Sequence, residues 1–478
     1  MLDRRGFLTM AGAAFIGSPA IGSEASPELQ TLSMRRRIIE VNGKAASVYG
    51  VYHNDALGPF VTDVRRGFNV RVKNELDEPS LIHWHGLTPP AALDGVPDIS
   101  GPAIPAGSAA EYRFTLPFSG TYWMHSHYGL QEQQLMTAPL IIRQPGQYEG
   151  LQEIVVMLSD FSFRSPEEIF RSLTAKPDKK PNMTSDHEMN DGMMMPMGHH
   201  ESTSAGMVMP DLNDVVYDAF LANDRTLADP AVFHVEQAGR VLLRIINGAA
   251  MSAFHLDLGD LNAKLVAVDG QDILPLYGNR FPIAQAQRLD LLIELPKENR
   301  SWPILFILEG ESRQTGVILT PPNASIARIP EQASKASDAI TLDFESKLRA
   351  AWPLTSRAPD RRIPIDLTGN MSSYVWSIDN VVWSPTATPI PLRAGERIEI
   401  AMTNKTMMSH PMHLHGHRFQ VVEINGARIG GAVRDTVLVP PQSRVVIAFD
   451  ADNPGLWAFH CHSAYHMHAG MFATLKYL

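Results

Sequence analysis

The chain has 478 residues, of which 44% are hydrophobic and 19% charged, so it can bury several cores and is not intrinsically disordered. Its net charge of −10 argues against a nucleic-acid-binding protein, because phosphate backbones are bound by clustered Lys and Arg. The single cysteine excludes a disulfide framework and any zinc site built from several thiolates. The 34 Gly and 35 Pro follow no collagen-like period and indicate frequent turns, as in an all-β protein with many loops.

Residues 1–25 resemble a twin-arginine signal peptide. Arg4 and Arg5 stand before a stretch of small and apolar residues that begins at Phe7. We expect cleavage near Ala25 and a periplasmic mature protein; an ordinary secretory signal or a short helix are the alternatives. Elsewhere the sequence holds no run of about 18 apolar residues, so we expect no stable membrane insertion.

Short β-type runs recur along the rest of the chain between turn residues. Apolar and polar residues alternate at 68–73 and 397–402, which is typical of half-buried strands. Many such strands predict sandwiches or barrels.

A weak internal repeat relates the two ends of the chain. Asn74 precedes His83 by nine residues, and Asn404 precedes His413 by the same distance. A middle copy is degenerate and lacks paired histidines, so we expect it mainly to space the outer two. The predicted domains are residues 30–145, 146–325 and 326–478.

Residues 183–209 interrupt the strand pattern of the middle domain. They contain eight Met together with three His and several acids, and almost no strand-forming residues. Two interpretations of this methionine-rich insert are open. It is either a low-complexity insert without a role, or a segment that captures a soft metal, because thioether sulfur binds Cu(I) well and Zn or Mg poorly.

Histidines form an unusual number of His-x-His pairs. Chance placement of 18 His would give roughly one such pair, whereas the chain has six. On a strand, residues i and i+2 share a face, so each pair aims two imidazoles in one direction. Imidazole suits Zn, Cu, Fe and Ni, so four pairs in two matched segments predict a metal centre of unspecified metal. These four pairs are His83/His85, His125/His127, His413/His415 and His460/His462.

Cys461 narrows the choice of metal. This thiol lies in a His-Cys-His sequence and is followed by His466 and Met471. One Cys, two His and a weak axial Met form the blue-copper arrangement, in which His410 would supply the second imidazole. Along a strand, Cys461 faces opposite to both neighbouring histidines, so two metal sites can lie on the two sides of one strand. A buried free cysteine among chance histidines is the alternative.

These motifs resemble the four copper motifs of the multicopper oxidases, a family of laccases, cuprous oxidases and copper-resistance oxidases. The resemblance implies an all-β fold of three cupredoxin-like Greek-key barrel or sandwich domains, the middle one without copper. It also implies four copper ions, of which the type 1 copper is held by His410, Cys461, His466 and axial Met471. The implied trinuclear cluster between the first and third domains has a type 2 copper on His83 and His413, and a type 3 pair on His85, His125, His127, His415, His460 and His462.

The resemblance implies an oxidase that takes single electrons at the type 1 copper and reduces O2 to water at the trinuclear cluster. Protons must reach that cluster, and Asp94 matches the family's acidic position, nine residues after His85. A simple turn role in an Asp-Gly pair is the alternative. A second acid is expected just after His466, where this chain has Met467 and His468, so a second proton path is in doubt. His417 and His468 fall outside the ligand pattern.

The electron donor is either Cu(I), in copper tolerance, or a phenol or aromatic amine. The methionine-rich insert and the pair Met407 and Met408 favour Cu(I), and so does the stretch 158–168, which resembles the copper-resistance oxidases. Against Cu(I), cuprous oxidases usually keep an acid near that Met pair, where this chain has Lys405 and Thr406. An axial Met implies a modest type 1 potential, which disfavours demanding laccase substrates.

Three other functions remain open at this stage. One is a general laccase without a role in copper homeostasis, and another is a non-catalytic periplasmic copper-binding protein. The third is a copper nitrite reductase, which normally has two domains and lacks the paired histidines at both ends. We expect a monomer that binds no nucleic acid.

Overall fold

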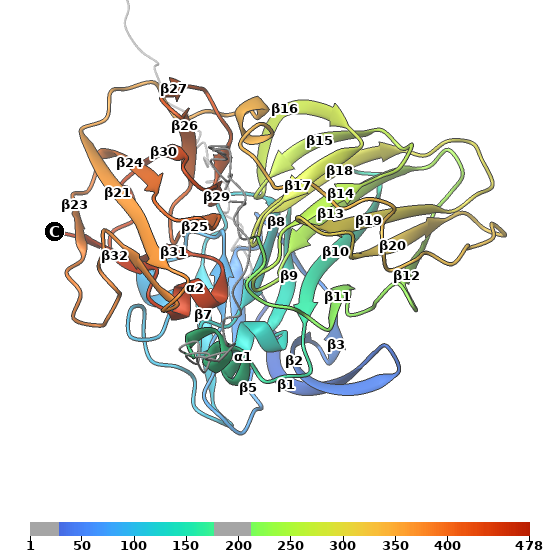
Figure 1. Ribbon diagram of the computed structural model, residues 1–478, viewed down its shortest axis with the longest axis horizontal. Coiled ribbons are helices and arrows are strands. Elements are labelled where there is room, and N and C mark those ends of the chain that lie inside the picture. Colours follow the sequence, from blue (N-terminus) through green and yellow to red (C-terminus); the bar gives the residue numbers. More distant parts are fainter. Residues whose placement is uncertain (1–27, 176–211) are drawn as a thin grey trace, which may run out of the picture.

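The computed structural model describes residues 28–175 and 212–478 (Figure 1). The predicted signal peptide 1–25 and the methionine-rich insert 183–209 lie outside these described residues. Six sheets pair into three β-sandwiches, which follow one another along the chain from blue through green to red in Figure 1.

The first domain pairs a five-stranded with a four-stranded sheet. Its elements are β1 Gln30–Val41, β2 Lys44–His53, β3 Ala56–Leu57, β4 Phe60–Asp63, β5 Phe68–Asn74, β6 His83–His85, η1 Ala91–Leu93, β7 Ala109–Phe114, β8 Gly120–His125, η2 Gln131–Gln134 and β9 Thr137–Arg143. The strand orders are β3-β2-β1-β5-β7 and β4-β9-β8-β6.

The middle domain pairs a six-stranded with a five-stranded sheet. Its elements are β10 Gln152–Phe161, α1 Pro166–Thr174, β11 Ala219–Ala222, β12 Ala231–His234, β13 Arg240–Asn247, β14 Phe254–Asp257, β15 Ala263–Val268, β16 Gln271–Gly278, β17 Arg280–Ile283, β18 Arg288–Glu294, β19 Trp302–Leu308 and β20 Gln314–Thr320. The strand orders are β11-β10-β13-β18-β15-β16 and β12-β20-β19-β14-β17.

The third domain pairs a seven-stranded with a five-stranded sheet. Its elements are η3 Glu345–Lys347, β21 Arg361–Asn370, β22 Val375–Ile378, β23 Ile390–Leu392, β24 Arg397–Asn404, β25 His410–Leu414, β26 Phe419–Ile424, β27 Ala427–Arg428, β28 Val433–Arg434, β29 Thr436–Val439, β30 Arg444–Asp450, β31 Leu456–Cys461, α2 Ala464–His468 and β32 Phe472–Tyr477. The strand orders are β22-β21-β24-β30-β26-β27, with β28 beside β26, and β23-β32-β31-β25-β29.

All three domains share one pairing pattern, which confirms the internal repeat. The first long strand of each runs parallel to a later strand, in β1/β5, β10/β13 and β21/β24. Each of these later strands ends in an asparagine, namely Asn74, Asn247 and Asn404. The side-chain amide of each donates hydrogen bonds to one backbone carbonyl in the following loop and to a second carbonyl further along the chain. In the outer domains, this anchored loop leads to the histidine strand β6 or β25, which explains the common spacing of nine residues.

The histidine strands have the same register in both outer domains. His83 lies opposite His125 across β6 and β8, and His413 lies opposite His460 across β25 and β31. The residue after His125 is a serine, whereas the residue after His460 is the cysteine. Only the third domain can therefore offer a thiolate to a metal.

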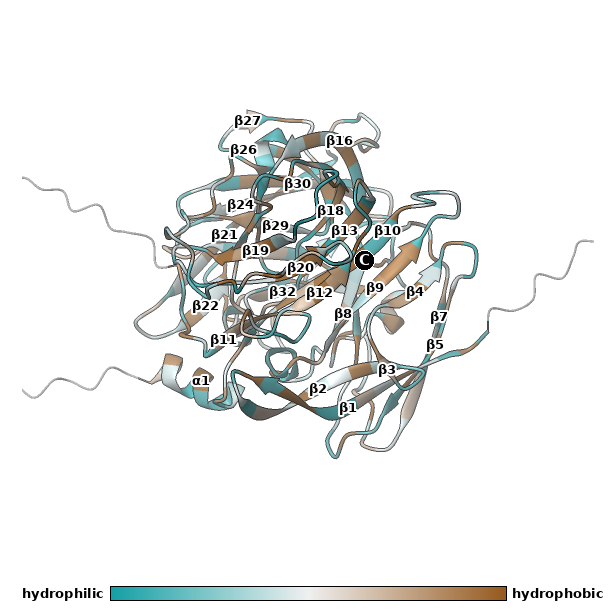
Figure 2. Ribbon diagram, turned by 90° about the vertical axis from the view of Figure 1, so that its right-hand side faces the viewer, coloured by the Kyte–Doolittle hydropathy of each residue, from teal (hydrophilic) through white to brown (hydrophobic). Residues whose placement is uncertain are grey.

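Strand alternation separates the histidines from the core. Trp84, between His83 and His85, is fully buried and packs against Phe68 and Tyr112 in the first domain's core. Apolar residues, brown in Figure 2, concentrate along the strands. The two histidines thus face away from the apolar layer, toward the third domain.

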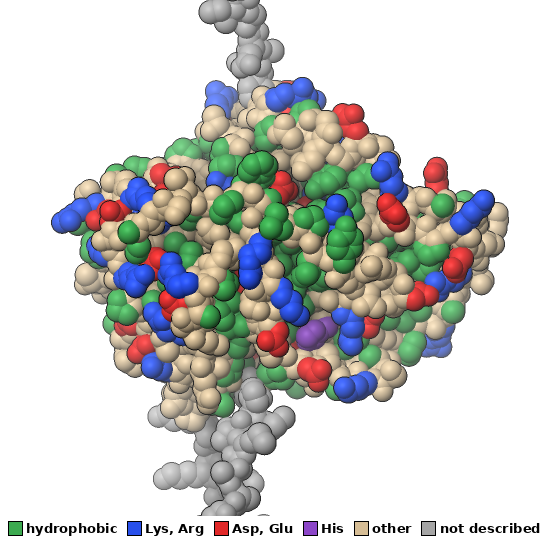
Figure 3. Space-filling model, turned by 90° about the horizontal axis from the view of Figure 1, so that it is seen from above, with side chains coloured by type: hydrophobic (Ala, Val, Ile, Leu, Met, Phe, Trp, Pro, Cys, Tyr) green, Lys and Arg blue, Asp and Glu red, His purple; other side chains and the backbone are tan. Residues whose placement is uncertain are grey.

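The molecular surface agrees with the sequence composition. On the face shown in Figure 3, Lys and Arg are interspersed with Asp and Glu. Within the described ranges, no helix has the length and apolar character required to cross a membrane.

Candidate metal centre

The eight paired histidines of the outer domains converge in one buried cluster. Nε2 of His415 lies 2.9 Å from Nε2 of His460, and Nε2 of His125 lies 3.3 Å from Nε2 of His462. The second of these contacts joins the first domain to the third. The buried cluster, called the histidine cluster below, consists of His83, His85, His125, His127, His413, His415, His460 and His462.

Ring nitrogens without partners test whether the histidine cluster suits a metal. His83 Nδ1 donates a hydrogen bond to the carbonyl of Asp94, and His413 Nδ1 donates to the carbonyl of Asp435, both at 2.8 Å, which leaves each Nε2 unpartnered. A buried polar atom without a partner is destabilising, and metal-bound imidazoles typically donate their other N–H to a carbonyl or carboxylate. The cluster therefore fits metal ions, and its other unpartnered nitrogens are His85 Nδ1 and His127 Nε2.

Asp94 touches histidines of both outer domains. Its Oδ2 accepts a hydrogen bond from His415 Nδ1 at 2.8 Å, and its Oδ1, which has no hydrogen-bond partner, lies 3.3 Å from His83 Nδ1. A turn role also holds, because Gly95 has φ +81° and a Cβ there would lie 1.9 Å from the carbonyl oxygen of Ile82. Asp94 therefore forms the turn and contacts the cluster; its proton role remains a prediction.

Glu132, on η2, is a second buried acid that the sequence reasoning missed. Its Oε2 lies 3.0 Å from His125 Nδ1, and its Oε1 lies 3.7 Å from His462 Nδ1. Burial raises the pKa of Glu132 well above its usual value. The positions just after His466 hold Met467 and His468, whereas this acid lies in the first domain. It could have been noticed as the sole acid between His127 and β9.

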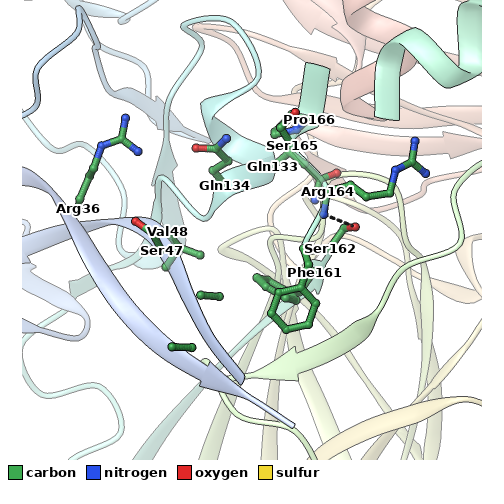
Figure 4. Close-up of a pocket in the computed structure, with 13 residues that line it drawn as sticks. Arg36, Ser47, Val48, Gln133, Gln134, Phe161, Ser162, Arg164, Ser165 and Pro166 are labelled. Atoms are coloured by element: carbon green, nitrogen blue, oxygen red, sulfur yellow. Dashed lines mark hydrogen bonds between the residues drawn. The ribbon is translucent and has the colours of Figure 1, made fainter. Parts of the chain in front are cut away.

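A cavity beside η2 is separate from the histidine cluster. Figure 4 shows it between the β1–β2 hairpin, η2 and the segment that leads into α1, with a volume of about 340 Å³. Gln133, in its wall, donates to Asp160 Oδ1 at 3.1 Å and accepts from Tyr217 OH at 2.6 Å. These bonds tie η2 to the middle domain.

The predicted type 1 residues form a second cluster. Cys461 Sγ lies 3.6 Å from His410 Nδ1 and 3.7 Å from His466 Nδ1, and all three side chains are buried. Met471 is also buried. Its carbonyl accepts a hydrogen bond from the Cys461 N–H at 3.1 Å, which places this residue next to the cysteine. A buried thiol with two converging imidazole nitrogens and a neighbouring Met fits a type 1 copper.

β31 connects the two clusters. His460 is opposite His413 in the ladder and Cys461 is opposite Met412, so consecutive side chains of β31 face opposite sides. The backbone from Cys461 to its neighbouring histidines is therefore a covalent link between the two clusters.

Asp214, from the middle domain, lies against the type 1 cluster and was also missed. Its Oδ2 lies 2.9 Å from His466 Nε2 and accepts from Tyr374 OH at 2.6 Å, while its Oδ1 has no hydrogen-bond partner. Burial alone would lower the pKa of His466, but Asp214 and Cys461 outweigh burial and raise it to about 9. On the other side, Thr406 Oγ1 lies 2.8 Å from His410 Nε2.

His417 and His468 lie outside both clusters, as predicted. His417 is buried, with Nδ1 3.0 Å from the carbonyl of His415 and Nε2 2.6 Å from Tyr477 OH. His468 is exposed, and its ring lies 4.8 Å from that of Phe170 on α1.

Comparisons with known proteins agree with this architecture. Three family models described as multicopper oxidase match residues 34–147, 152–328 and 356–477. The chain is 30% identical to multicopper oxidase MmcO of Mycobacterium tuberculosis, over 94% of this chain and 86% of that protein. It is 28% identical to copper resistance protein A of Escherichia coli, over 85% of each protein.

Solved structures show the same fold. Fet3p, a multicopper oxidase that functions in iron import, superimposes with a TM-score of 0.76 at 20% identity, covering 94% of this chain and 90% of that one. A laccase from Botrytis aclada gives a TM-score of 0.75 at 21% identity, covering 94% and 87%.

Three cupredoxin sandwiches with a thiolate cluster beside a histidine cluster define a copper oxidase that uses O2. The chain belongs to the multicopper oxidase family. Members of this family bind four copper ions of types 1, 2 and 3, which agrees with the two clusters described above.

Proposed function

We propose that this chain oxidises Cu(I) and reduces O2 to water, as a periplasmic enzyme of copper tolerance. One observation supports the oxidase function above all. Histidines from both ends of the chain converge, several of their ring nitrogens have no hydrogen-bond partner, and a Cys–His–His cluster lies beside them. When bound, four copper ions supply the one-electron storage that four-electron reduction of O2 requires.

Each copper has a ligand set among these residues. The type 1 copper takes His410, Cys461, His466 and Met471, and the type 2 copper takes His83 and His413. The type 3 pair divides into two groups of three whose nitrogens lie within 4.8 Å of one another: His85, His125 and His462, and His127, His415 and His460.

The protein's own groups handle electrons and protons. The backbone of β31 joins Cys461 to the histidine cluster, which gives electrons a short covalent route. Asp94 would pass protons toward the cluster through Oδ1, the oxygen without a hydrogen-bond partner. Its other oxygen keeps His415 in place.

The surroundings of the type 1 cluster support Cu(I) over a phenol. His466 is 1% exposed and its outer nitrogen is occupied by Asp214, so a ring-shaped donor has no direct access to that imidazole. Asp214 is itself buried, but with one unpartnered oxygen it adds negative charge next to His466, which favours a cationic donor at this end of the site. Cuprous oxidases usually have an acid near the Met pair, where this chain has Lys405 and Thr406. Asp214 provides an acid at the type 1 cluster from the middle domain instead.

Both described flanks of the methionine-rich insert contact the type 1 region. On the N-terminal side, Phe170 of α1 stacks on Tyr465 with ring centroids 6.2 Å apart. On the C-terminal side, Asp214 contacts His466. Because both described flanks lie at the type 1 region, a soft-metal-binding sequence between them favours Cu(I) as the donor.

Export and organisation complete the proposal. The twin-arginine sequence 1–25 supports a periplasmic location, and similarity to copper resistance protein A supports a role in copper tolerance. We propose domain boundaries at residues 30–145, 146–325 and 326–478, which the three matched family models support, and a monomeric enzyme.

The identity of the electron donor is tested by measuring oxygen consumption of the copper-loaded protein. Cu(I) and a small phenol are compared at matched copper occupancy. Deleting 183–209 should lower Cu(I) oxidation by about tenfold or more while phenol oxidation changes less than about twofold, because Cu(I) depends on thioether ligands. A length-preserving variant with all eight Met replaced by Ser is the matched control and should behave like the deletion. Equal losses for both donors, or none, would contradict a Cu(I) role for the insert.

A further inference from the structure

An arginine of the middle domain reaches the boundary of the histidine cluster, although the middle domain supplies no proposed copper ligand. Arg288, the first residue of β18, is fully buried. Its Nη1 donates to Asp435 Oδ1 at 2.8 Å and its Nη2 donates to Asp435 Oδ2, which forms a bidentate pair. Such forks fix a carboxylate in both position and orientation.

Asp435 in turn contacts one histidine from each outer domain. Its Oδ1 lies 3.0 Å from His85 Nε2, and its carbonyl accepts the hydrogen bond of His413 Nδ1 at 2.8 Å. The hydroxyl of Thr436 donates to the same Oδ1 at 2.9 Å. The Arg288–Asp435 pair therefore lies directly behind a proposed type 3 ligand and a proposed type 2 ligand.

His85 is oriented differently from the other members of the cluster. The seven others direct Nε2 inward, whereas His85 gives Nε2 to Asp435 and leaves Nδ1 unpartnered toward the cluster. The hydrogen bond to one ring nitrogen decides which nitrogen carries the proton and which can bind a metal. The position of Asp435 thus selects the ligand atom of His85.

The backbone is shaped around this ion pair. Gly86 has φ +88°, and a Cβ there would lie 2.6 Å from both Arg288 Nη2 and Asp435 Oδ2. Arg288 Nε donates to the carbonyl of Thr121 in the first domain at 3.1 Å, and the guanidinium lies 5.8 Å from the Tyr122 ring. Residues of all three domains therefore hold Arg288 in one place.

A general interdomain ion pair would have the same burial but would not contact the histidine cluster. Arg244 and Asp290 form such a pair. Arg244 is buried on β13 and donates to Asp290 Oδ2 at 2.6 Å and to Thr121 Oγ1 of the first domain at 2.9 Å. Asp290 accepts hydrogen bonds from Arg244 and Thr121 and does not bond to a histidine of the cluster. Arg288 differs because its carboxylate partner is bonded to His85.

We propose that Arg288 is a positioning residue for the trinuclear centre. By fixing Asp435, it makes His85 present Nδ1 and supports the orientation of His413. This inference rests on the proposed ligand assignment above. It also means that the middle domain is more than a spacer.

Arg288→Lys tests the proposal, because lysine keeps the charge but loses the fork. Copper-loaded wild type, Arg288→Lys and Arg244→Lys are exposed to a chelator, and copper per chain, the EPR signal and the blue type 1 absorption are followed over time. We expect Arg288→Lys to lose histidine-cluster copper about 10–100-fold faster and to show uncoupled type 3 copper by EPR. Its blue absorption should persist, and Arg244→Lys should match wild type in all three measurements.

The other outcomes overturn the proposal. Arg288→Lys with wild-type copper retention, equal copper loss in both lysine variants, or simultaneous loss of blue absorption would each reduce Arg288 to a structural ion pair. If Arg288→Lys does not fold, Asp435→Asn, which keeps an oxygen facing His85 but removes the charge held by the guanidinium, must show the same selective loss. Wild-type protein without a coupled copper pair would instead refute the proposed function.

Discussion

The type 1 cluster and the histidine cluster are assembled in different ways. All predicted type 1 ligands lie in the third domain, where β25, β31 and α2 bring them together. The histidine cluster takes four imidazoles from each outer domain and is flanked by carboxylates that reach across the domain boundary, such as Asp94 and Glu132. One site therefore depends on folding within a domain, and the other also depends on docking between domains.

Cys461→Ser should have the largest effect, because it removes the type 1 site and leaves the histidine cluster in place. We expect loss of the blue absorption and of O2 consumption with every donor, since electrons can no longer enter at the thiolate. The fold should remain soluble, because a serine is close in size, and copper should remain in the histidine cluster. Absorption spectra, copper content and oxygen consumption measure these effects. A variant that stays blue would refute the type 1 assignment.

Asp94→Asn should lower turnover at the histidine cluster and leave the type 1 copper site unchanged. Asparagine keeps an oxygen that accepts the hydrogen bond of His415, but it cannot donate a carboxyl proton. We expect kcat to fall by about 10²–10⁴-fold, the usual contribution of a general acid, while the blue absorption is unchanged. Asp98→Asn, four residues further along the same loop, is the control and should retain full turnover. Unchanged turnover in Asp94→Asn would limit this residue to its turn role.

The sequence could predict the ligands because their signal is local. His-x-His pairs need only the strand period of two, and Asn74 and Asn404 mark the loops that deliver them. The supporting groups carry no such local signal. Asp214 meets His466 across 252 positions, and Arg288 meets Asp435 across 147, so only the docking of domains reveals them. Glu132 follows the same rule, because it belongs to the first domain and meets His462 of the third only where the two domains dock.

The middle domain changes the comparison, because its residues contact groups of both clusters. Arg288 binds Asp435, which contacts His85 of the histidine cluster, and Asp214 contacts His466 of the type 1 cluster. Asp160 fixes the loop that meets α2 by accepting hydrogen bonds from the Ala250 and Met251 N–H groups. If Arg288 and Asp214 act as proposed, the middle domain does more than space the other two. A copper-free copy of the fold can lose its ligands and still provide the charges that orient the ligands of its neighbours.

Asp214→Asn should give the smallest effect and show how electrons enter. Asparagine can still face His466 but offers no charge to an approaching cation, so Cu(I) oxidation should fall about tenfold, the lower range for a partner of a metal ligand. The blue absorption should remain, because the type 1 residues themselves are intact. Asp218→Asn, four residues further on and bonded instead to Ser162, is the matched control and should oxidise Cu(I) like wild type. If both variants oxidise Cu(I) at the wild-type rate, electrons enter the type 1 site by a route that does not involve Asp214.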